Sequence, residues 1–113
     1  MILDFWRHDC APCLVELPKL EKLALEWGDK VSVQLIHVGG PEEAMQEKLT
    51  KYGGRLSCAF DANQCTAARY CVRSFPQLFV IDADGVVRAH IEEGQKDFAK
   101  AVRAAVEPLI QEK

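Results

Sequence analysis

Short apolar runs recur along the chain and are separated by glycine, proline and charged residues. Residues 2–6 are apolar and aromatic, and residues 31–38 form a second apolar stretch, so both are predicted to be buried strands. Leu56, Cys58 and Phe60 alternate with other residues, as in a short strand. Residues 78–82 and 86–91 flank Asp84-Gly85, which predicts a hairpin.

Segments with helical spacing lie between these strands. Five residues recur on one face of a predicted helix over 11–27, which Gly28-Asp29 ends. They are Cys13, Leu17, Leu20, Ala24 and Trp27. A second helix starts at Pro41 with carboxylates in its first turn and runs to about residue 52. Asp61 is predicted to cap a helix over 62–71, and residues 98–109 form a closing amphipathic helix.

The resulting order, β-α-β-α-β-α-β-β-α, predicts an α/β fold. Strands separated by helices favour parallel pairing with helices on both faces, so we expect a central mixed sheet, mostly parallel, with a C-terminal antiparallel hairpin. The 113 residues are predicted to be a single domain, 1–113. Met1 leads directly into a core strand with no visible signal peptide, so we expect the chain to be trimmed.

Composition and charge narrow the classes of partner. Hydrophobic residues make up 49% of the chain and charged residues 27%, and the net charge is −3. Lysines and arginines are scattered, which argues against a nucleic-acid or anionic-membrane partner. No apolar run approaches the roughly 20 residues that cross a bilayer, so no membrane insertion by this segment is expected.

Cys10 and Cys13 have the spacing of a redox pair. Five cysteines occur in all, and an odd number excludes a fully paired disulfide framework within one chain. Cys10 falls at the predicted start of the first helix, where unpaired N–H groups and the helix dipole stabilise a thiolate. Pro12 stiffens the turn and lacks an N–H that a helix start does not need.

The surrounding segments resemble the thioredoxin superfamily over nearly the whole chain. Asp4-Phe5-Trp6, then three residues, then Cys10-Ala11-Pro12-Cys13, looks like the strand and active-site turn of thioredoxins. Cys13-x-x-Glu16-x-Pro18 is similar to the extracytoplasmic TlpA/ResA-like thiol–disulfide oxidoreductases. Residues 70–82 resemble the segment with the family's cis-proline, and residues 41–60 resemble an insert of the same branch.

This resemblance implies a role for each residue near the pair. Cys10 matches the nucleophile and Cys13 the resolving thiol that releases the reduced product. Asp4 and Glu16 match carboxylates that exchange a proton with the second thiol, which suits a raised pKa in an apolar setting. The substrate-binding surface is implied to comprise a cis Phe75–Pro76 bond facing the cysteines, together with Pro12 and Trp6.

The implied activity is reduction or exchange of protein disulfides through a mixed disulfide, with no cofactor and no metal. Its partners would be proteins with disulfides or cysteines and an upstream thiol–disulfide electron donor, and we expect a monomer. The family resemblance suggests a bacterial periplasmic or extracytoplasmic location. A chain complete as given would instead be cytoplasmic.

Two residues depart from the family pattern. Asp9 stands before Cys10 where the family usually has tryptophan, so a flat apolar docking surface is lost and a carboxylate opposes thiolate formation. Arg7 and His8 are placed to offset that charge. Phe75 is bulkier than the threonine or valine usual before the cis-proline, which predicts a different substrate groove.

Alternatives remain for the other cysteines and for the pair. Cys58 and Cys65 are predicted to be small core residues. A second, regulatory disulfide among Cys58, Cys65 and Cys71 is a further hypothesis, in which pairing of Cys65 with Cys71 requires the helix to end early. A second function class is a copper- or zinc-binding metallochaperone-like module, with His8, Cys10, Cys13 and Cys71 as ligands. A third is a docking module whose redox activity is damped by Asp9.

Overall fold

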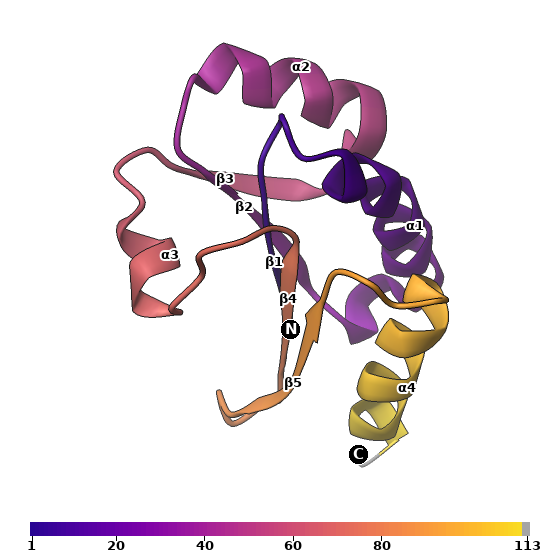
Figure 1. The fold of residues 1–113 in the computed structure, drawn as a ribbon. Helices are drawn as coiled ribbons and strands as arrows, with labels where there is room; N and C mark the ends of the chain where they lie inside the picture. Colours follow the sequence, from indigo (N-terminus) through magenta and orange to yellow (C-terminus); the bar gives the residue numbers. More distant parts are fainter. Residues whose placement is uncertain (112–113) are drawn as a thin grey trace.

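The computed structural model describes residues 1–111, and Figure 1 shows how their helices and strands are arranged. The predicted order of elements is confirmed. The strands are β1 Ile2–Trp6, β2 Val33–Val38, β3 Ser57–Asp61, β4 Gln77–Ile81 and β5 Val87–Glu92. The helices are α1 Ala11–Trp27, α2 Glu42–Gly53, α3 Cys65–Arg69 and α4 Phe98–Gln111, with a 3-10 turn, η1, at Gly28–Lys30.

Within residues 1–111 the strands form one mixed sheet in the order β3-β2-β1-β4-β5, so β1 lies at its centre. β1 pairs in parallel with β2, and β2 pairs in parallel with β3. β4 pairs antiparallel with both β1 and β5. All five residues of β1 are buried, as expected for an apolar strand with neighbours on both edges and helices on both faces.

The antiparallel pairing of β1 with β4 differs from the prediction that only the final hairpin needs to be antiparallel. A parallel crossover requires a helix that carries the chain back along the whole strand. α3 has five residues and so rises only about 7.5 Å, whereas a five-residue strand extends roughly 17 Å. The chain therefore enters β4 from the end at which β3 finished, and β4 runs in the opposite direction.

Two apolar cores cover the two faces of the sheet. The larger lies between the sheet and helices α1, α2 and α4, and it includes Ile2, Trp6 and Leu35 from the strands. The smaller lies under α3 and includes Leu3, Phe5 and Phe79. Helices therefore flank both faces as predicted, three on one side and the short α3 on the other (Figure 1).

α3 begins and ends inside the predicted range of 62–71. Its N-cap is Gln64, but Asp61 still caps the first turn because its carboxylate accepts hydrogen bonds from the N–H groups of Thr66 at 3.2 Å and Ala67 at 2.9 Å. With so short a helix only Ala67 is buried, and Cys65 lies exposed. The prediction that Cys65 is a core residue is therefore wrong.

α1 is the longest helix and matches its predicted bounds. Its buried residues are Cys13, Leu17, Leu20, Leu23 and Trp27, which form one face against the sheet. Pro18 lies inside the helix with its side chain exposed. In the part of the chain that the structure describes, no helix combines the length and apolar character needed to cross a bilayer.

Two leucines of α1 provide a test of this packing. Leu20 is completely buried in the larger core, whereas Leu25 is 59% exposed. We expect Leu20→Ala to lower the free energy of unfolding by about 2–5 kcal/mol, because it removes buried methyl groups and leaves a cavity. Leu25→Ala should change it by less than about 0.5 kcal/mol. Urea unfolding of the oxidised proteins measures both, and equal losses would contradict the assigned helix face.

Candidate active site

The cysteine pair lies where the chain passes from the central strand into the first helix. Cys10 is the N-cap of α1, with extended backbone angles, and its Sγ accepts a hydrogen bond from the N–H of Cys13 at 3.2 Å. Cys10 and Cys13 form a disulfide, and their Cα atoms are 5.3 Å apart. Cys10 is half-buried, whereas Cys13 is only 1% exposed, so one sulfur is accessible to a partner and the other is covered.

The residues around the start of α1 favour the N-cap position of Cys10. Pro12 occupies the first turn, where a residue without an N–H removes no helix hydrogen bond. The N–H of Cys10 donates to the carbonyl of Arg7 at 3.3 Å, which closes a turn over residues 7–10. This turn carries the chain from the end of β1 at Trp6 to the start of α1.

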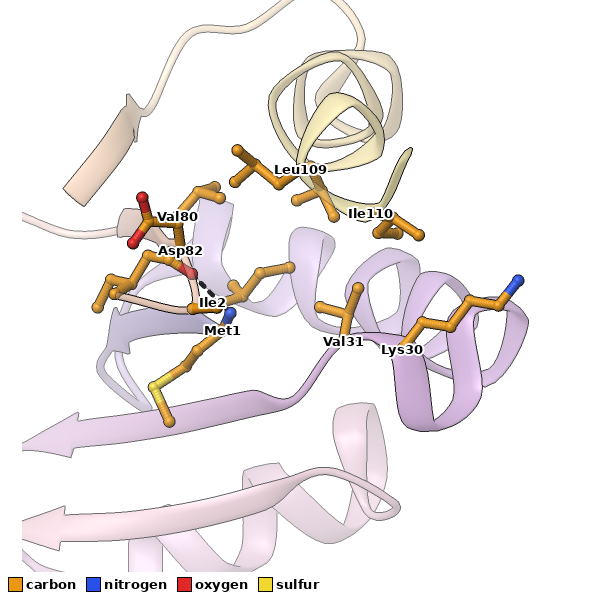
Figure 2. A pocket seen from close by; sticks show the side chains of 11 residues that line it. Met1, Ile2, Lys30, Val31, Val80, Asp82, Leu109 and Ile110 are labelled. Atoms are coloured by element: carbon orange, nitrogen blue, oxygen red, sulfur yellow. Dashed lines mark hydrogen bonds between the residues drawn. The ribbon is translucent and has the colours of Figure 1, made fainter. Parts of the chain in front are cut away.

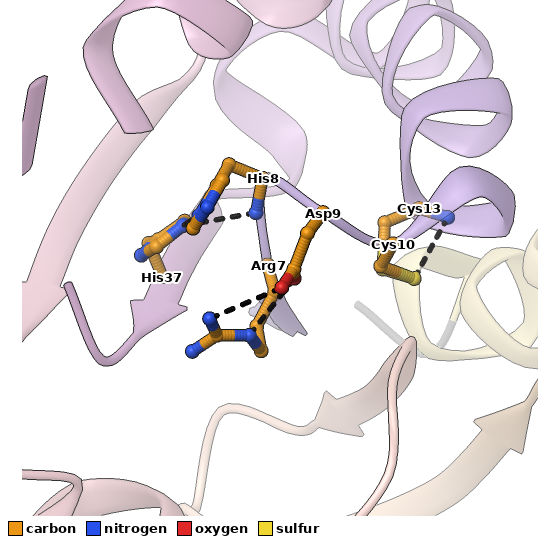
Figure 3. Close-up of a disulfide and its surroundings, with 6 residues drawn as sticks. All are labelled: Arg7, His8, Asp9, Cys10, Cys13 and His37. Carbon is orange, nitrogen blue, oxygen red and sulfur yellow. Dashed lines mark hydrogen bonds and ion pairs between the residues drawn. A yellow bond between two sulfur atoms is a disulfide. The ribbon is translucent and has the colours of Figure 1, made fainter. Parts of the chain in front are cut away.

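Asp9 directly precedes Cys10, and its negative charge is compensated by an ion pair with Arg7. Arg7 Nε donates to Asp9 Oδ1 at 2.9 Å, and this bond with Arg7 lowers the pKa of the Asp9 carboxyl (Figure 3). Arg7 also donates through Nη1 to the carbonyl of Val38, so the guanidinium is fixed to the end of β2. The predicted opposition between Asp9 and the thiolate is therefore reduced by Arg7.

Gly39 makes room for that arginine. Its φ is +76°, a conformation that L side chains rarely adopt, and a Cβ at this position would lie 2.7 Å from Arg7 Nη1. Both the backbone and the close approach thus require glycine. One residue further on, the Gly40–Pro41 bond is cis, a feature that the sequence analysis did not predict.

Asp4 lies under the site with its side chain almost completely buried. Asp4 lies two residues from both Ile2 and Trp6 along β1, so the three side chains point to the same face of the sheet, the one that α1 covers. Among residues 1–111 the Oδ1 of Asp4 has no hydrogen-bond partner. Burial raises the pKa of Asp4 well above its ordinary value, and the charge of Glu16 adds to the shift. Ionisation of Asp4 is therefore harder in the folded protein than in water.

Glu16 is a second perturbed carboxyl, one turn after Cys13 on α1. Partial burial is the main cause that raises the pKa of Glu16, to about 7, and the charge of Glu93 adds to the shift while Lys19 opposes it. A carboxyl with a pKa near 7 exchanges protons readily at neutral pH.

Residues 75 and 76 precede β4 at the end of the sheet where β1 leads into the cysteine loop. The Phe75–Pro76 bond is cis, as predicted, and Pro76 is buried immediately before β4. Because Gln77 pairs with Phe5 in antiparallel register, Pro76 adjoins the end of β1 from which the loop departs. Phe75 packs against both apolar cores.

The structure revises the position of Trp6 and adds a residue that the sequence analysis missed. Trp6 has no exposed surface, so it supports the site from beneath and cannot line the surface that a substrate meets. His37, also completely buried, lies beside it with ring centroids 4.9 Å apart and contacts His8 in the loop before Cys10 (Figure 3). A histidine near the end of a buried strand, two residues before Gly39, was the available signal.

Residues 1–111 contain no group of three or more histidine, cysteine or acidic side chains arranged to hold a metal ion. His8 contacts His37 instead of the cysteines, so the ligand set of the metallochaperone alternative is not assembled. Cys58, Cys65 and Cys71 are free thiols, and the hypothesis of a second disulfide is contradicted in this structure. Burial raises the pKa of the Cys58 thiol, which lies 3.9 Å from the sulfur of Met45.

Comparisons with known proteins agree with this geometry. The sequence profile of the AhpC/TSA family matches residues 1–90. The thiol–disulfide oxidoreductase ResA of Bacillus anthracis is 32% identical over 100 residues, which are 86% of this chain and 57% of that protein. Thioredoxin-like protein YneN of Bacillus subtilis is 28% identical over 91 residues, 78% of this chain and 53% of that protein. The chain thus spans little more than half the length of these relatives.

Solved structures show the same fold. A secreted disulfide oxidoreductase of Mycobacterium tuberculosis superposes with a TM-score of 0.84 at 26% identity, covering 96% of this chain and 80% of that one. StoA from Bacillus subtilis superposes with a TM-score of 0.78 at 17% identity, covering 91% and 78%. With its half-buried and buried cysteines at the start of α1 and its cis-proline, the chain belongs to the AhpC/TSA family and is a TlpA/ResA-like member of the thioredoxin superfamily.

Proposed function

We propose that the protein is a thiol–disulfide oxidoreductase that reduces or exchanges disulfides of protein substrates through Cys10 and Cys13. The observation that carries the proposal is the disulfide at the start of α1, which joins a half-buried sulfur to a completely covered one. Only Cys10 is accessible to a substrate disulfide, and its sulfur already accepts a backbone N–H of the helix start. That environment favours a thiolate in the reduced protein.

The reaction proceeds by two exchanges. The Cys10 thiolate attacks one sulfur of the substrate disulfide, a mixed disulfide forms, and the second substrate sulfur leaves as a thiolate. Cys13, after losing its proton, attacks the Cys10 sulfur and releases the first substrate sulfur. The substrate gains two electrons, and the enzyme is left with its Cys10–Cys13 disulfide. An upstream dithiol donor supplies two electrons to restore the pair.

The two perturbed carboxyls supply the proton chemistry for the buried thiol. Cys13 and Asp4 lie in the layer between β1 and α1, and Glu16 follows Cys13 by one helical turn. In its ionised form either carboxyl can accept the Cys13 proton, and its raised pKa makes it a stronger base than an ordinary carboxylate; the protonated carboxyl can later return that proton. Asp4 and Glu16 therefore act as proton partners of Cys13.

Substrates are proposed to bind beside the cysteines, at the end of the sheet where β1 finishes and β4 begins. Pro12 and Phe75 are both partly exposed there, and Pro76 adjoins the end of β1. An extended peptide placed along residues 75–76 would present its disulfide to Cys10. Phe75 fills space near this end of the sheet, which favours substrates with small residues next to the cysteine.

The assigned nucleophile can be tested by reduction of insulin with dithiothreitol as electron donor. Cys10→Ser should reduce turnover to the uncatalysed rate, because no thiolate remains to attack the substrate. Reduced Cys13→Ser, mixed with insulin after the dithiothreitol has been removed, should accumulate a covalent mixed disulfide, since the resolving thiol is absent and no other thiol cleaves the adduct. Non-reducing electrophoresis and mass spectrometry detect that adduct.

Cys65→Ser is the matched control, because Cys65 is an exposed free thiol at the start of α3. It should keep the rate of the unmodified protein. Insulin reduction by Cys10→Ser at an undiminished rate would contradict the assigned nucleophile.

The raised pKa of Glu16 predicts a pH dependence of stability. Since its folded-state pKa is about 7 and its ordinary value 4.5, ionisation is harder in the folded protein. The stability that Glu16 contributes is fully present below pH 4.5 and is lost as the pH rises through 7. In denaturant titrations of the oxidised protein, Glu16→Gln should therefore lose less free energy of unfolding across this interval than the unmodified protein.

Glu47→Gln makes the same chemical change at an exposed position of α2 and should follow the unmodified protein. Asp4 has a shift of the same direction, so part of the loss should persist in Glu16→Gln. An identical pH profile for Glu16→Gln and the unmodified protein would disprove the raised pKa.

A further inference from the structure

His37 is a buried histidine with both ring nitrogens engaged. It lies in β2 opposite Trp6 and has no exposed surface. Its Nδ1 is 2.9 Å from the carbonyl oxygen of Gly39, and its Nε2 is 3.0 Å from the backbone nitrogen of His8. The Nδ1 of His8 lies 3.1 Å from the same Nε2, and the two rings stack with centroids 5.2 Å apart.

These partners determine the protonation of the imidazole. A carbonyl oxygen only accepts hydrogen bonds, so His37 Nδ1 must carry a hydrogen. A backbone N–H only donates, so His37 Nε2 must present its lone pair to His8. The neutral tautomer protonated at Nδ1 is the one form that satisfies both bonds.

The groups packed around His37 favour the same neutral form. Trp6 from β1 and Phe60 from β3 contact the ring, with centroids at 4.9 and 6.0 Å. The charged and titratable side chains facing it are those of the loop, Arg7, His8 and Asp9. Burial is the main cause that lowers the pKa of His37, to about 4; the hydrogen bond to Gly39 and the charge of Asp9 oppose the shift, whereas His8 and Arg7 add to it.

We propose that His37 is a positioning residue for the redox reaction: by accepting the N–H of His8 it holds the 7–10 turn so that Cys10 stays at the N-cap of α1. The proposal rests on the proposed function of the Cys10–Cys13 pair. Three bonds in series connect His37 to the sulfur. His37 Nε2 accepts the N–H of His8. The N–H of Cys10 donates to the carbonyl of Arg7 across the turn, and the N–H of Cys13 donates to Cys10 Sγ.

His37 is placed to act mainly on the reduced protein. In the oxidised form the disulfide itself restrains Cys10, whereas the reduced sulfur depends on the turn for its position. A Cys10 sulfur displaced from the helix N–H groups loses stabilisation of its thiolate. The reduced state then becomes less favourable relative to the disulfide, which makes the pair a stronger reductant.

The test compares His37→Phe, which keeps a ring but has no acceptor, with His37→Gln, whose side-chain oxygen restores one. Reduced proteins are alkylated with iodoacetamide over a pH series, and modification of Cys10 is followed by peptide mass spectrometry. At a pH below the midpoint of both proteins, His37→Phe should react about tenfold more slowly, as one pH unit in midpoint implies. His37→Gln should recover most of the rate.

The glutathione equilibrium supplies a second readout. In His37→Phe the equilibrium constant should shift about tenfold towards the disulfide, which is about 30 mV for a two-electron couple. Phe60→Leu changes the packing on His37 and keeps both hydrogen bonds, so both readouts should match the unmodified protein. A Phe60→Leu shift as large as that of His37→Phe would overturn the hydrogen-bond role.

A second pair of variants decides the question if His37→Phe does not fold. His8→Ala keeps the N–H that His37 accepts, whereas His8→Pro removes it at the second position of the 7–10 turn, which proline favours. The alkylation midpoint should rise only in His8→Pro. Unchanged midpoints in both His37→Phe and His8→Pro, or no recovery in His37→Gln, would overturn the role of His37.

These measurements also separate this proposal from the proposed function. Alkylation and the glutathione equilibrium report on Cys10 without turnover of any substrate. A protein inactive towards insulin whose Cys10 midpoint still responds to His37 would lose the proposed function and keep the positioning role. If insulin turnover were normal but the Cys10 midpoint did not change when His37 is substituted, the proposed function would stand and the positioning role of His37 would be rejected.

Discussion

The site depends on the direct connection between the most buried strand and the first turn of the longest helix. β1 has neighbours on both edges and apolar cores on both faces, so its end at Trp6 is fixed in space. The turn over residues 7–10 transfers that rigidity to the N-cap of α1, where Cys10 lies. The same helix buries Cys13 against the sheet, so one helical turn separates an accessible sulfur from a covered one.

Charge around the pair is arranged at two depths. Near the surface Asp9 is ionised, but Arg7 compensates its charge and is itself fastened to Val38. In the interior, burial raises the pKa of Asp4 and so opposes its ionisation. Arg7 thus offsets the negative charge beside the helix start, and burial opposes the formation of a second negative charge at Asp4.

Much of the fold was predictable because its signals are local. The apolar run at 2–6, the helix over 11–27 and the hairpin at Asp84-Gly85 each follow from residue type and spacing. The antiparallel entry of β4 was not predictable, because it depends on α3 being too short to return the chain, and helix length is the least certain part of such a pattern.

The Cys10–Cys13 pair was also predictable, as was the cis bond before Pro76, both from the resemblance of these segments to the thioredoxin superfamily. The contact between His37 and His8 was not, because it joins residues 29 positions apart and exists only once β2 lies beside β1. The burial of Trp6 has the same origin. Side chains brought together by strand register leave little trace in a single sequence.

The close approach of Arg7 to Gly39 has a consequence for how this chain can vary. Any side chain at position 39 would collide with the guanidinium, and without Arg7 the carboxylate of Asp9 would lose its counter-charge. Positions 7 and 9 thus form one unit, in which a cation and an anion are expected to be gained or lost together, whereas the backbone angle of Gly39 favours glycine in either case. Homologues that carry an uncharged residue before the first cysteine should be released from this constraint and should tolerate a shorter residue at position 7.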